Sequence, residues 1–483
     1  MKLLSRKDLS LWIAFAIYAI ITGFLSWRHT MWRDELQLWL VASKSSTFSE
    51  LLKNISNENR PMGYFIFCWV ISRFTSNPEW LKLSNWLISV FMSYIVLFEL
   101  KIKNTVKILF LCGVIPLIGY SHIAQDYMLG TLLFIILIKY FLDGRKNSKF
   151  FFVAFIIANI HVLFLFASAG FVLIYFLDSI TASGSLKQLF KLNRKLIVLG
   201  SFYGISCLFI LIRVLQADGG SFGRPDVISP IYIAKRCFVL IASACFPFWD
   251  FQSGDQSSQI ISISLIFLGG LIFASLIVIS LIINFRNGIA ICVSNLLLLA
   301  GMSLGYSSYW WHFGVLYLLI FVSLLVVLGN HQPFRIPRKI PSLMLGVILG
   351  SQIFALFIGP RMNLWEIRPY STAEQTANFL KQNCDDSCTI ITNSQTSGSS
   401  ISGYMNGRDI YFADIGQFGS FARWGLPATE VTWDVMISSA KKFENAILVT
   451  SVLSDPPLGV LTIKSYSGAI WPDENFIVSR IAP

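Results

Sequence analysis

Long apolar segments separated by short basic loops dominate the chain as far as Ile358. A membrane-spanning helix needs about 20 mostly apolar residues, and cytoplasmic loops collect Lys and Arg. The first apolar segment, Leu11 to Trp27, follows Lys2, Arg6 and Lys7. We therefore expect the N-terminus inside the cell and the residues after Trp27 outside. No small-residue cleavage site follows the segment, so we interpret it as an uncleaved first span.

The same alternation predicts ten further spans, which makes eleven in total and puts the C-terminus outside. Basic loops at Lys101 to Lys107 and Asp143 to Lys149 are expected inside. The run from Phe150 to Leu177 is too long for one span, and we interpret it as two short helices that turn outside near His161. The other spans are Trp80–Leu100, Val106–Tyr120, the segment between Tyr127 and Asp143, Leu196–Val214, Ile260–Ile283, Ile289–Leu304, Gly314–Leu328 and Leu343–Ile358.

Two apolar runs do not fit the alternation of spans. Pro61 to Phe74, in the outer loop 28–79, has only 14 residues, a length that suits an interfacial helix. Ile231 to Trp249, in the outer loop 215–256, is interrupted by Lys235-Arg236. Counting either run as a span would place every later loop on the opposite side of the membrane. We therefore expect both to lie on the outer face of the membrane.

The chain changes character at Pro360, where hydropathy falls to soluble values. We therefore divide it into a membrane domain, 1–359, and an outer α/β domain, 360–483. Ser371 to Glu374 reads as a capping box that opens a helix to about Gln382. A second helix is expected within Thr429 to Phe443. The predicted strands are Thr389–Thr392, Asp409–Phe412, Ala446–Thr450 and Phe476–Ser479.

Composition supports this division and excludes several classes of protein. The chain is 55% hydrophobic and 13% charged, against about 25% charged in soluble domains, so we expect a mainly α polytopic membrane protein. Its net charge of +12 fits membrane topology and attraction to lipids, and no basic patch with interleaved aromatics suggests nucleic acid. No phosphate-binding glycine loop, hydrolase motif or zinc spacing is visible. Cys384 and Cys388 could form a disulfide if their domain lies outside the cytoplasm.

The strongest candidate for chemistry is Asp34-Glu35, just after the first span. Apolar residues flank the pair at helical spacing, which places it at an interface. A carboxylate at a partly dry surface can have a raised pKa and act as a general base. The alternative is a pair of solvated charges at the start of a helix, where the helix dipole favours them.

This stretch resembles the membrane glycosyltransferases with the GT-C fold, such as protein O-mannosyltransferases and the aminoarabinose transferases of lipid A. The family pattern, DE…HPPLYY, is matched by Asp34-Glu35 and by Arg60-Pro61-Met62-Gly63-Tyr64-Phe65, with Arg in place of His and Met in place of one Pro. The segment from Tyr120 to Gly130 looks like a second family loop, although Gln125 stands where Arg is usual. Trp311 to Gly314 resembles an Arg-His-x-Gly element of a related subgroup.

The resemblance implies a site on the outer face, where a sugar passes from a polyprenyl phosphate to an acceptor. Asp34 would be the base that activates the acceptor hydroxyl, and Glu35 its supporting partner. Cations would hold the lipid phosphate, with Arg60 as first choice because Arg binds phosphate through two nitrogens. The other expected substrate-binding residues are Tyr64, Asp126, Tyr127, His161, Lys235, Arg236 and His312. No metal or other cofactor is predicted, because a monophosphate donor has less need of one.

For each cationic residue, an interpretation without a role in substrate binding remains open. Arg60 could simply extend from the start of an interfacial helix, Lys235 and Arg236 could only attract anionic headgroups, and His312 could belong to an aromatic belt. The Asp126 carboxylate could bind sugar hydroxyls or a metal.

The resulting hypothesis is an inverting, polyprenyl-phosphate-sugar-dependent hexosyltransferase of a bacterial inner membrane. Its acceptor would be a surface glycan such as the O-antigen of lipopolysaccharide, which phage-type serotype-converting glucosyltransferases modify. A transporter or lipid-linked glycan flippase is a competing reading, but the ionisable residues gather on one face, not at the midplane. An O-antigen polymerase or ligase is a further alternative.

Overall fold

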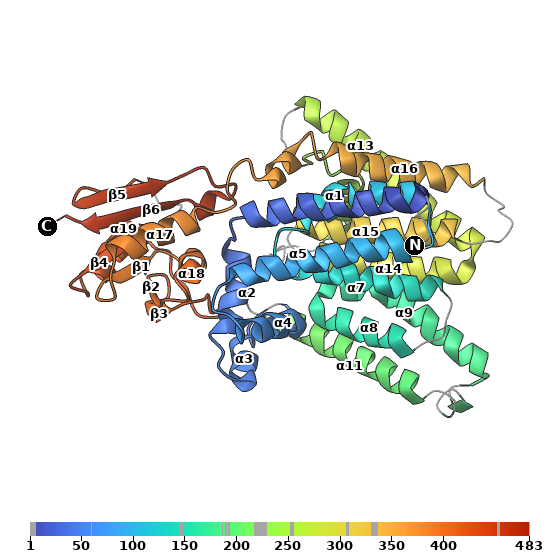
Figure 1. Cartoon of the computed structure of the whole chain (residues 1–483), viewed down its shortest axis with the longest axis horizontal. Helices are drawn as coiled ribbons and strands as arrows, with labels where there is room; N and C mark the ends of the chain where they lie inside the picture. The colour runs from blue at the N-terminus through green and yellow to red at the C-terminus, as the bar shows by residue number, and fades with distance from the viewer. Residues whose placement is uncertain are drawn as a thin grey trace.

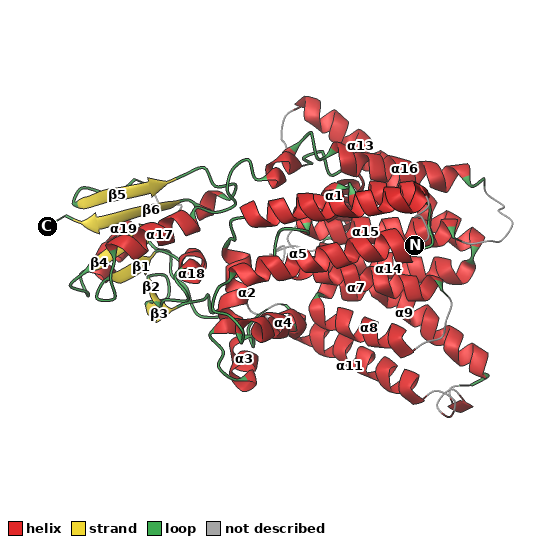
Figure 2. Cartoon of the chain, in the orientation of Figure 1, coloured by secondary structure: helices red, strands yellow, loops and turns green. Residues whose placement is uncertain are grey.

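The apolar segments of the chain form a bundle of long helices, and a small α/β domain lies at one end of it (Figure 1). The computed structural model describes residues 6–58, 60–143, 148–185, 187–188, 191, 194–216, 229–251, 256–305, 309–329, 337–451 and 455–482. Lys2, residues 144–147 of the expected inner loop, and residues 217–228 and 252–255 of the loop predicted at 215–256 lie outside these ranges. Strands occur only in the C-terminal domain among the described residues (Figure 2).

Every predicted span coincides with helical structure. The helices of the bundle are α1 (Arg6–Arg28), α5 (Glu79–Tyr94) with the π-helical turn η1 (Ile95–Glu99), α6 (Asn104–Leu111) with a second such turn η2 (Ile115–Gly119), α7 (Asp126–Leu142), α8 (Ser148–Ile160), α9 (Val162–Ser183), α11 (Arg194–Gln216), α12 (Pro230–Cys245), α13 (Gln256–Ile283), α14 (Phe285–Gly305), α15 (Trp310–Leu328) and α16 (Lys339–Phe354).

Seven of the described helices are long and apolar enough to cross a membrane. They span Leu9–Arg28, Glu79–Glu99, Val162–Ser183, Arg194–Arg213, Ser258–Ile283, Phe285–Ser303 and Trp310–Leu328. Large apolar side chains on their outer faces, such as Ile205, Ile263 and Phe267, are more than half exposed. Such faces are covered by lipid in a membrane protein, since no soluble protein leaves so much apolar surface to water. The chain is therefore a polytopic membrane protein.

Helix α15 forms the centre of the bundle. Other parts of the protein bury 94% of the apolar segment of α15, but only 17% of the Arg194–Arg213 segment of α11. Helices α7, α9, α12, α14 and α16 all pack on α15. The elements at its ends are therefore held in place from several sides.

Close approach of α9 and α14 depends on Gly170. The amide of Gly170 donates to Ser294 Oγ over 3.0 Å. A Cβ atom at this position would lie 2.0 Å from the carbonyl oxygen of Ala290. Small residues of this kind let membrane helices pack backbone to backbone.

The first loop contains three short helices, α2 (Arg33–Ser43), α3 (Phe48–Asn54) and α4 (Met62–Ser72). Helix α4 has 11 residues, so at 1.5 Å per residue it is about 16 Å long and too short to span a bilayer core of about 30 Å. It packs on α2, α5 and α8 between the bundle and the C-terminal domain (Figure 1). This length agrees with the expectation that Pro61 to Phe74 is not an ordinary span, and its place on the outer face of the membrane stays a prediction. We call this end of the bundle, with α2 to α4 and the C-terminal domain, the domain end.

The C-terminal domain contains one six-stranded mixed sheet with the order β3-β2-β1-β4-β6-β5. Its central strands β1, β2 and β4 are parallel, while β3, β5 and β6 pair antiparallel. The elements after the short η3 turn (Pro360–Trp365) are α17 (Ala373–Asn383), β1 (Thr389–Thr392), α18 (Gln395–Tyr404), β2 (Ile410–Phe412), β3 (Gln417–Gly419), α19 (Trp433–Ala440), β4 (Ala446–Thr450), β5 (Val460–Tyr466), the turn η4 (Pro472–Glu474) and β6 (Phe476–Ile481).

Four predicted strands and both predicted helices are present in this domain, but the predicted capping box is wrong. Thr372, not Ser371, precedes α17. Ser371 Oγ instead accepts from the Ala373 amide over 2.9 Å and donates to Glu474 Oε2 over 2.6 Å. Ser371 therefore keeps a local hydrogen bond at the start of α17 and adds a tertiary one to a buried carboxyl group. Helix α18 and strands β3 and β5 were not predicted.

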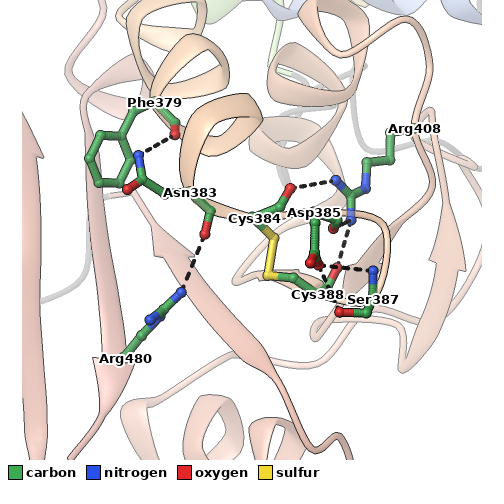
Figure 3. The surroundings of a disulfide bond; sticks show 8 residues. All are labelled: Phe379, Asn383, Cys384, Asp385, Ser387, Cys388, Arg408 and Arg480. Carbon is green, nitrogen blue, oxygen red and sulfur yellow. Dashed lines mark hydrogen bonds between the residues drawn. A yellow bond between two sulfur atoms is a disulfide. The ribbon is translucent and has the colours of Figure 1, made fainter.

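The cysteine pair of this domain forms a disulfide, Cys384–Cys388 (Figure 3). The guanidinium of Arg408 donates to the carbonyl oxygens of Cys384, Asp385 and Cys388 at 3.0, 2.6 and 2.7 Å. The turn after α17 is thus closed by a covalent bond on one side and by one arginine on the other.

Replacing Gly170 by Ala should weaken the bundle. The added methyl group must push α9 away from α14, and overpacking of this kind costs about 1–3 kcal/mol. We expect a lower unfolding temperature of the detergent-solubilised protein. Gly204→Ala on α11 is the matched control, because a Cβ there meets nothing within 4 Å. Equal unfolding temperatures of the two variants would contradict the close contact.

The buried Glu474 makes the stability of the domain depend on pH. Burial raises the pKa of Glu474 from 4.5 to about 7, against the lowering effects of Ser371 and Arg33. The fold therefore favours the protonated acid, and its stability falls as pH rises from about 4.5 to about 7. At pH 8 we expect Glu474→Gln to unfold at a higher temperature than the wild type, with a free energy of unfolding larger by roughly 2–3 kcal/mol, and we expect little difference at pH 4.5. The exposed Glu444→Gln serves as control, and a pH-independent effect of Glu474→Gln would contradict this account.

Candidate functional site

The acidic and basic residues singled out in the first loop lie next to each other. Asp34 is in the first turn of α2, and Arg60 directly precedes the proline that opens α4. Arg60 Nη2 is 3.6 Å from Asp34 Oδ2, and Arg33 Nε is 3.7 Å from Asp34 Oδ1. The Asp34 and Arg60 side chains are each 28% exposed, so the pair lies at a surface and not in the core.

The surroundings of Asp34 shift its proton affinity upward. Partial removal from water raises the pKa of Asp34, and the positive charges of Arg60 and Arg33 oppose that rise. The neighbouring Glu35 and Asp473 raise it further. A carboxylate with a raised pKa is a stronger base, which is the property required for removing a proton from a hydroxyl group.

Behind Arg60 lie buried polar atoms without hydrogen-bond partners among the described residues. They are Arg60 Nη1, the Tyr64 hydroxyl and both carboxylate oxygens of Asp126. Burial lowers the pKa of Arg60, but the negative charge of Asp126, followed by that of Asp34, raises it more, so the guanidinium is firmly charged. Buried polar groups are normally paired. This group therefore has unused donors and acceptors for a polar ligand.

Aromatic residues from three parts of the chain gather around Tyr127, at the start of α7. Its ring lies 5.1 Å from that of Tyr120, 4.7 Å from that of His161 and 6.3 Å from that of His312. His161 precedes α9, and its Nδ1 accepts from the Leu163 amide over 3.0 Å, so the predicted turn at this residue is confirmed. The structure thus brings Tyr127, His161 and His312 together.

Tight packing fixes the start of α15 against this aromatic group. The Tyr120 hydroxyl donates to the carbonyl oxygen of Trp311. A Cβ atom on Gly314 would lie 2.2 Å from the same hydroxyl. Glycine at this position therefore permits the contact that holds His312 beside Tyr127.

The residues before Arg60 are held by an arginine that the sequence did not indicate. Arg213 Nη2, from α11, donates to the carbonyl oxygens of Ile55, Ser56 and Glu58 at 2.5, 3.3 and 3.3 Å. A cavity of only about 10 Å³ remains between Arg60, Arg213 and Asn159. This volume corresponds to about one water molecule, so a larger ligand requires local opening.

Lys235 and Arg236 belong to a different part of the bundle. Helix α12 packs chiefly on α13, α14 and α15, whereas α4 packs on α2, α5 and α8. Arg236 Nη1 lies 3.2 Å from the Tyr232 hydroxyl of its own helix, and Lys235 is exposed. Lys235 and Arg236 therefore lie on a different helix from the one that Arg60 precedes, and their role in binding the substrate stays a prediction.

Glu35 does not face Arg60 but points into the protein. Its carboxylate is fully buried and accepts from the backbone amides of Trp32 and Ala124 at 3.3 and 2.5 Å. It also contacts His29 Nε2 at 2.7 Å. The adjacent acids of the predicted pair thus have different surroundings, since one lies beside a surface cation and the other inside a closed network.

His29 connects Glu35 to Glu366, in the segment that leads to the C-terminal domain. Its Nδ1 contacts Glu366 Oε1, while His122 Nε2 lies 3.5 Å from the same oxygen. Burial lowers the pKa of His29, but the charges of Glu35 and Glu366 raise it to about 10. Sequence reasoning missed His29, His122 and Glu366, because they lie far apart in the chain and carry no spacing typical of a site.

No protein-family model matches this chain, and no curated protein sequence is significantly similar to it.

The C-terminal domain covers the outer side of α2. The Gln37 side chain donates to the carbonyl oxygen of Ala422 and accepts from its amide, both over 2.8 Å. Trp32 stacks on Trp471 with 5.0 Å between ring centroids. Arg33 pairs with Asp473. Helix α2 is therefore fixed from both sides.

Removing the Gln37 side chain should loosen the domain. Gln37→Ala leaves the buried amide and carbonyl of Ala422 without partners, which costs about 1–3 kcal/mol for each unsatisfied group. We expect faster proteolysis in the segment 359–372 and a lower unfolding temperature. Gln382→Ala is the control, since Gln382 is exposed on α17. Identical proteolysis of both variants would contradict the docking role of Gln37.

Proposed function

We propose that this chain is a membrane glycosyltransferase that moves a sugar from a polyprenyl-phosphate donor to an acceptor hydroxyl at the domain end of the bundle. The observation that carries the proposal is the pairing of Asp34 with Arg60, 3.6 Å apart at a partly exposed surface. A base and a phosphate-binding cation are the two groups that such a transfer requires. The resemblance to the GT-C family supplies the reaction type.

The donor would be held through its phosphate. Arg60 can offer Nη1, which has no hydrogen-bond partner among the described residues, while Nη2 remains near Asp34. The Tyr64 hydroxyl and the Asp126 carboxylate, equally unpartnered in the described part of the chain, are suited to sugar hydroxyl groups. The ring of Tyr127, next to Asp126 in α7, packs against Tyr120 and His161.

In the transfer step, Asp34 removes the proton of the acceptor hydroxyl. The acceptor oxygen then forms a bond to the anomeric carbon of the sugar from the side opposite the phosphate. The bond between that carbon and the phosphate oxygen breaks, and the oxygen keeps both electrons. The leaving group is a polyprenyl phosphate, whose new charge Arg60 stabilises, and the anomeric configuration is inverted.

The proposal includes eleven spans, with the domain end outside the cell. In support, the start of α1 and the C-terminal domain lie at opposite ends of the bundle, as an odd number of spans requires (Figure 1). A disulfide in the domain also suits an oxidising compartment. A bacterial inner membrane and a lipopolysaccharide O-antigen acceptor follow from the resemblance alone.

The test is transfer of labelled hexose from polyprenyl phosphate to a lipopolysaccharide glycan by the purified chain in liposomes. We expect Asp34→Asn to lower the rate by 10²-fold or more with unchanged unfolding temperature, because the amide cannot take the proton. The matched control is Asp434→Asn, which replaces an exposed acid on α19. Arg60→Lys should keep part of the activity that Arg60→Ala loses, since Lys retains the charge but not the forked geometry.

Full activity of Asp34→Asn would refute its role as the base. If the wild type transfers no sugar from any polyprenyl-phosphate donor, the proposed reaction itself is wrong.

A further inference from the structure

Three metal-binding side chains meet at the junction between the bundle and the C-terminal domain. His29 directly follows α1, His122 lies between η2 and α7, and Glu366 follows η3. One ligand atom from each lies within 4.8 Å of the others. The residues are 2%, 0% and 5% exposed, so the cluster is closed to solvent. It is separate from the Arg60 and Asp126 groups described above.

Two members of the cluster have unused ligand atoms. Neither ring nitrogen of His122 has a hydrogen-bond partner among the described residues, and the same holds for Glu366 Oε2. The approach of His122 Nε2 to Glu366 Oε1, at 3.5 Å, is too long for a good hydrogen bond. A fully buried imidazole without partners costs free energy, unless something else at the site binds it.

The third member has the support that metal-binding histidines usually have. Glu35 contacts His29 Nε2 at 2.7 Å, and this leaves Nδ1 directed at Glu366. A carboxylate behind a histidine fixes the tautomer and orientation of the ring and makes it a better metal ligand. Glu35 is itself fixed by the amides of Trp32 and Ala124.

The backbone of Glu366 is in a conformation that side-chain-bearing residues rarely adopt. Its φ is 52° and its ψ is 46°, in the left-handed region. The surrounding contacts hold it there, since Arg28 Nη2 donates to the Glu366 carbonyl over 3.1 Å and Trp365 Nε1 donates to Leu356 over 2.8 Å. Strain of this kind is found where a side chain must reach a defined point.

We propose that His29 Nδ1, His122 Nε2 and Glu366 bind one divalent zinc ion, which fastens the C-terminal domain to the bundle. Two imidazoles and one carboxylate are ligands that zinc accepts and that magnesium and calcium do not favour. In a tetrahedral site with bonds of 2.0–2.2 Å, ligand atoms are about 3.4 Å apart. The 3.5 Å between His122 Nε2 and Glu366 Oε1 matches that spacing.

Binding requires one adjustment of the cluster. The direct contact between His29 and Glu366 must open to admit the ion. The second carboxylate oxygen, Oε2, has no hydrogen-bond partner in the described structure, so a small rotation of this side chain can present either oxygen. Bonds from His29 and Glu366 to the ion then replace the hydrogen bond between these two side chains.

Burial gives the ion a structural role. The three ligand residues are 5% exposed or less and come from separate segments of the chain, so we assign the ion a structural role. It joins the end of α1, the connection before α7 and the segment before α17, three pieces that are distant in the sequence. The connection before α7 includes Ala124, whose amide holds Glu35.

The experiment measures metal in the full-length chain, purified in detergent without chelator. We expect about one zinc per chain by plasma mass spectrometry, and a tetrahedral absorption spectrum when cobalt replaces the zinc. His122→Ala should bind zinc at least 100-fold more weakly. Because His122 makes no hydrogen bond in the described structure, its removal leaves the contacts among Glu35, His29 and Glu366 in place.

His161→Asn is the matched control, since Asn can still cap α9 but removes a histidine outside the cluster. It should retain the zinc. Adding zinc to the metal-free wild type should raise the unfolding temperature, and the same addition should leave His122→Ala unchanged. Glu366→Gln should behave like His122→Ala, because a neutral amide is a poor zinc ligand.

Two results would overturn the proposal. One is a chain that contains no zinc and gains no stability when zinc or cobalt is added, which would leave a proton-bridged cluster of His29, Glu35 and Glu366. The other is zinc that His122→Ala binds as tightly as the wild type and His161→Asn do. Neither result depends on glycosyl transfer, so the two proposals fail independently.

Discussion

The burial of α2 between the bundle and the C-terminal domain is the contact on which the arrangement of the site depends. Helix α2 is short, and isolated helices of this length are marginal in water. Its inner side is fixed through Glu35, and its outer side through Gln37 and Trp32. Asp34 lies between these anchors, so a carboxylate at the protein surface gains the positional precision of the interior. For the proposed transfer this matters because the efficiency of a general base depends on its distance from the proton that it removes.

Sequence patterns were sufficient for most of the elements and for part of the site. Apolar length and basic loops located the helices of the bundle except α12, whose segment, Ile231 to Trp249, is expected on the outer face but packs on α13, α14 and α15. The shortness of Pro61 to Phe74 identified α4 as an exception. Short runs of mostly β-branched residues identified β1 and β4 at their full lengths. The pairing of Asp34 with Arg60 could be inferred because both lie at the starts of short helices in the same loop.

The remaining features depend on contacts that no local pattern encodes. Helix α18 is rich in Ser and Gly, which disfavour helices, yet it forms because eight of its ten residues are buried, several of them against α2 and the sheet. The start of α17 was misjudged by one residue because Ser371 is oriented by a bond to the buried Glu474, a contact that is distant in the sequence. Hydropathy also cannot distinguish the central α15 from the peripheral α11, although the protein buries 94% of the apolar segment of the first and only 17% of that of the second.

Asp34 and Glu35 show why consecutive residues can serve separate purposes. A helix turns by about 100° per residue, so neighbouring side chains leave the axis in different directions. Here that turn sends one carboxylate toward Arg60 and the other toward His29. One helical turn therefore supplies a carboxylate to the protein surface and another to the buried network of His29. Exchanging the order of the two acids would keep their charge and composition, yet it would give each environment a side chain of the wrong length.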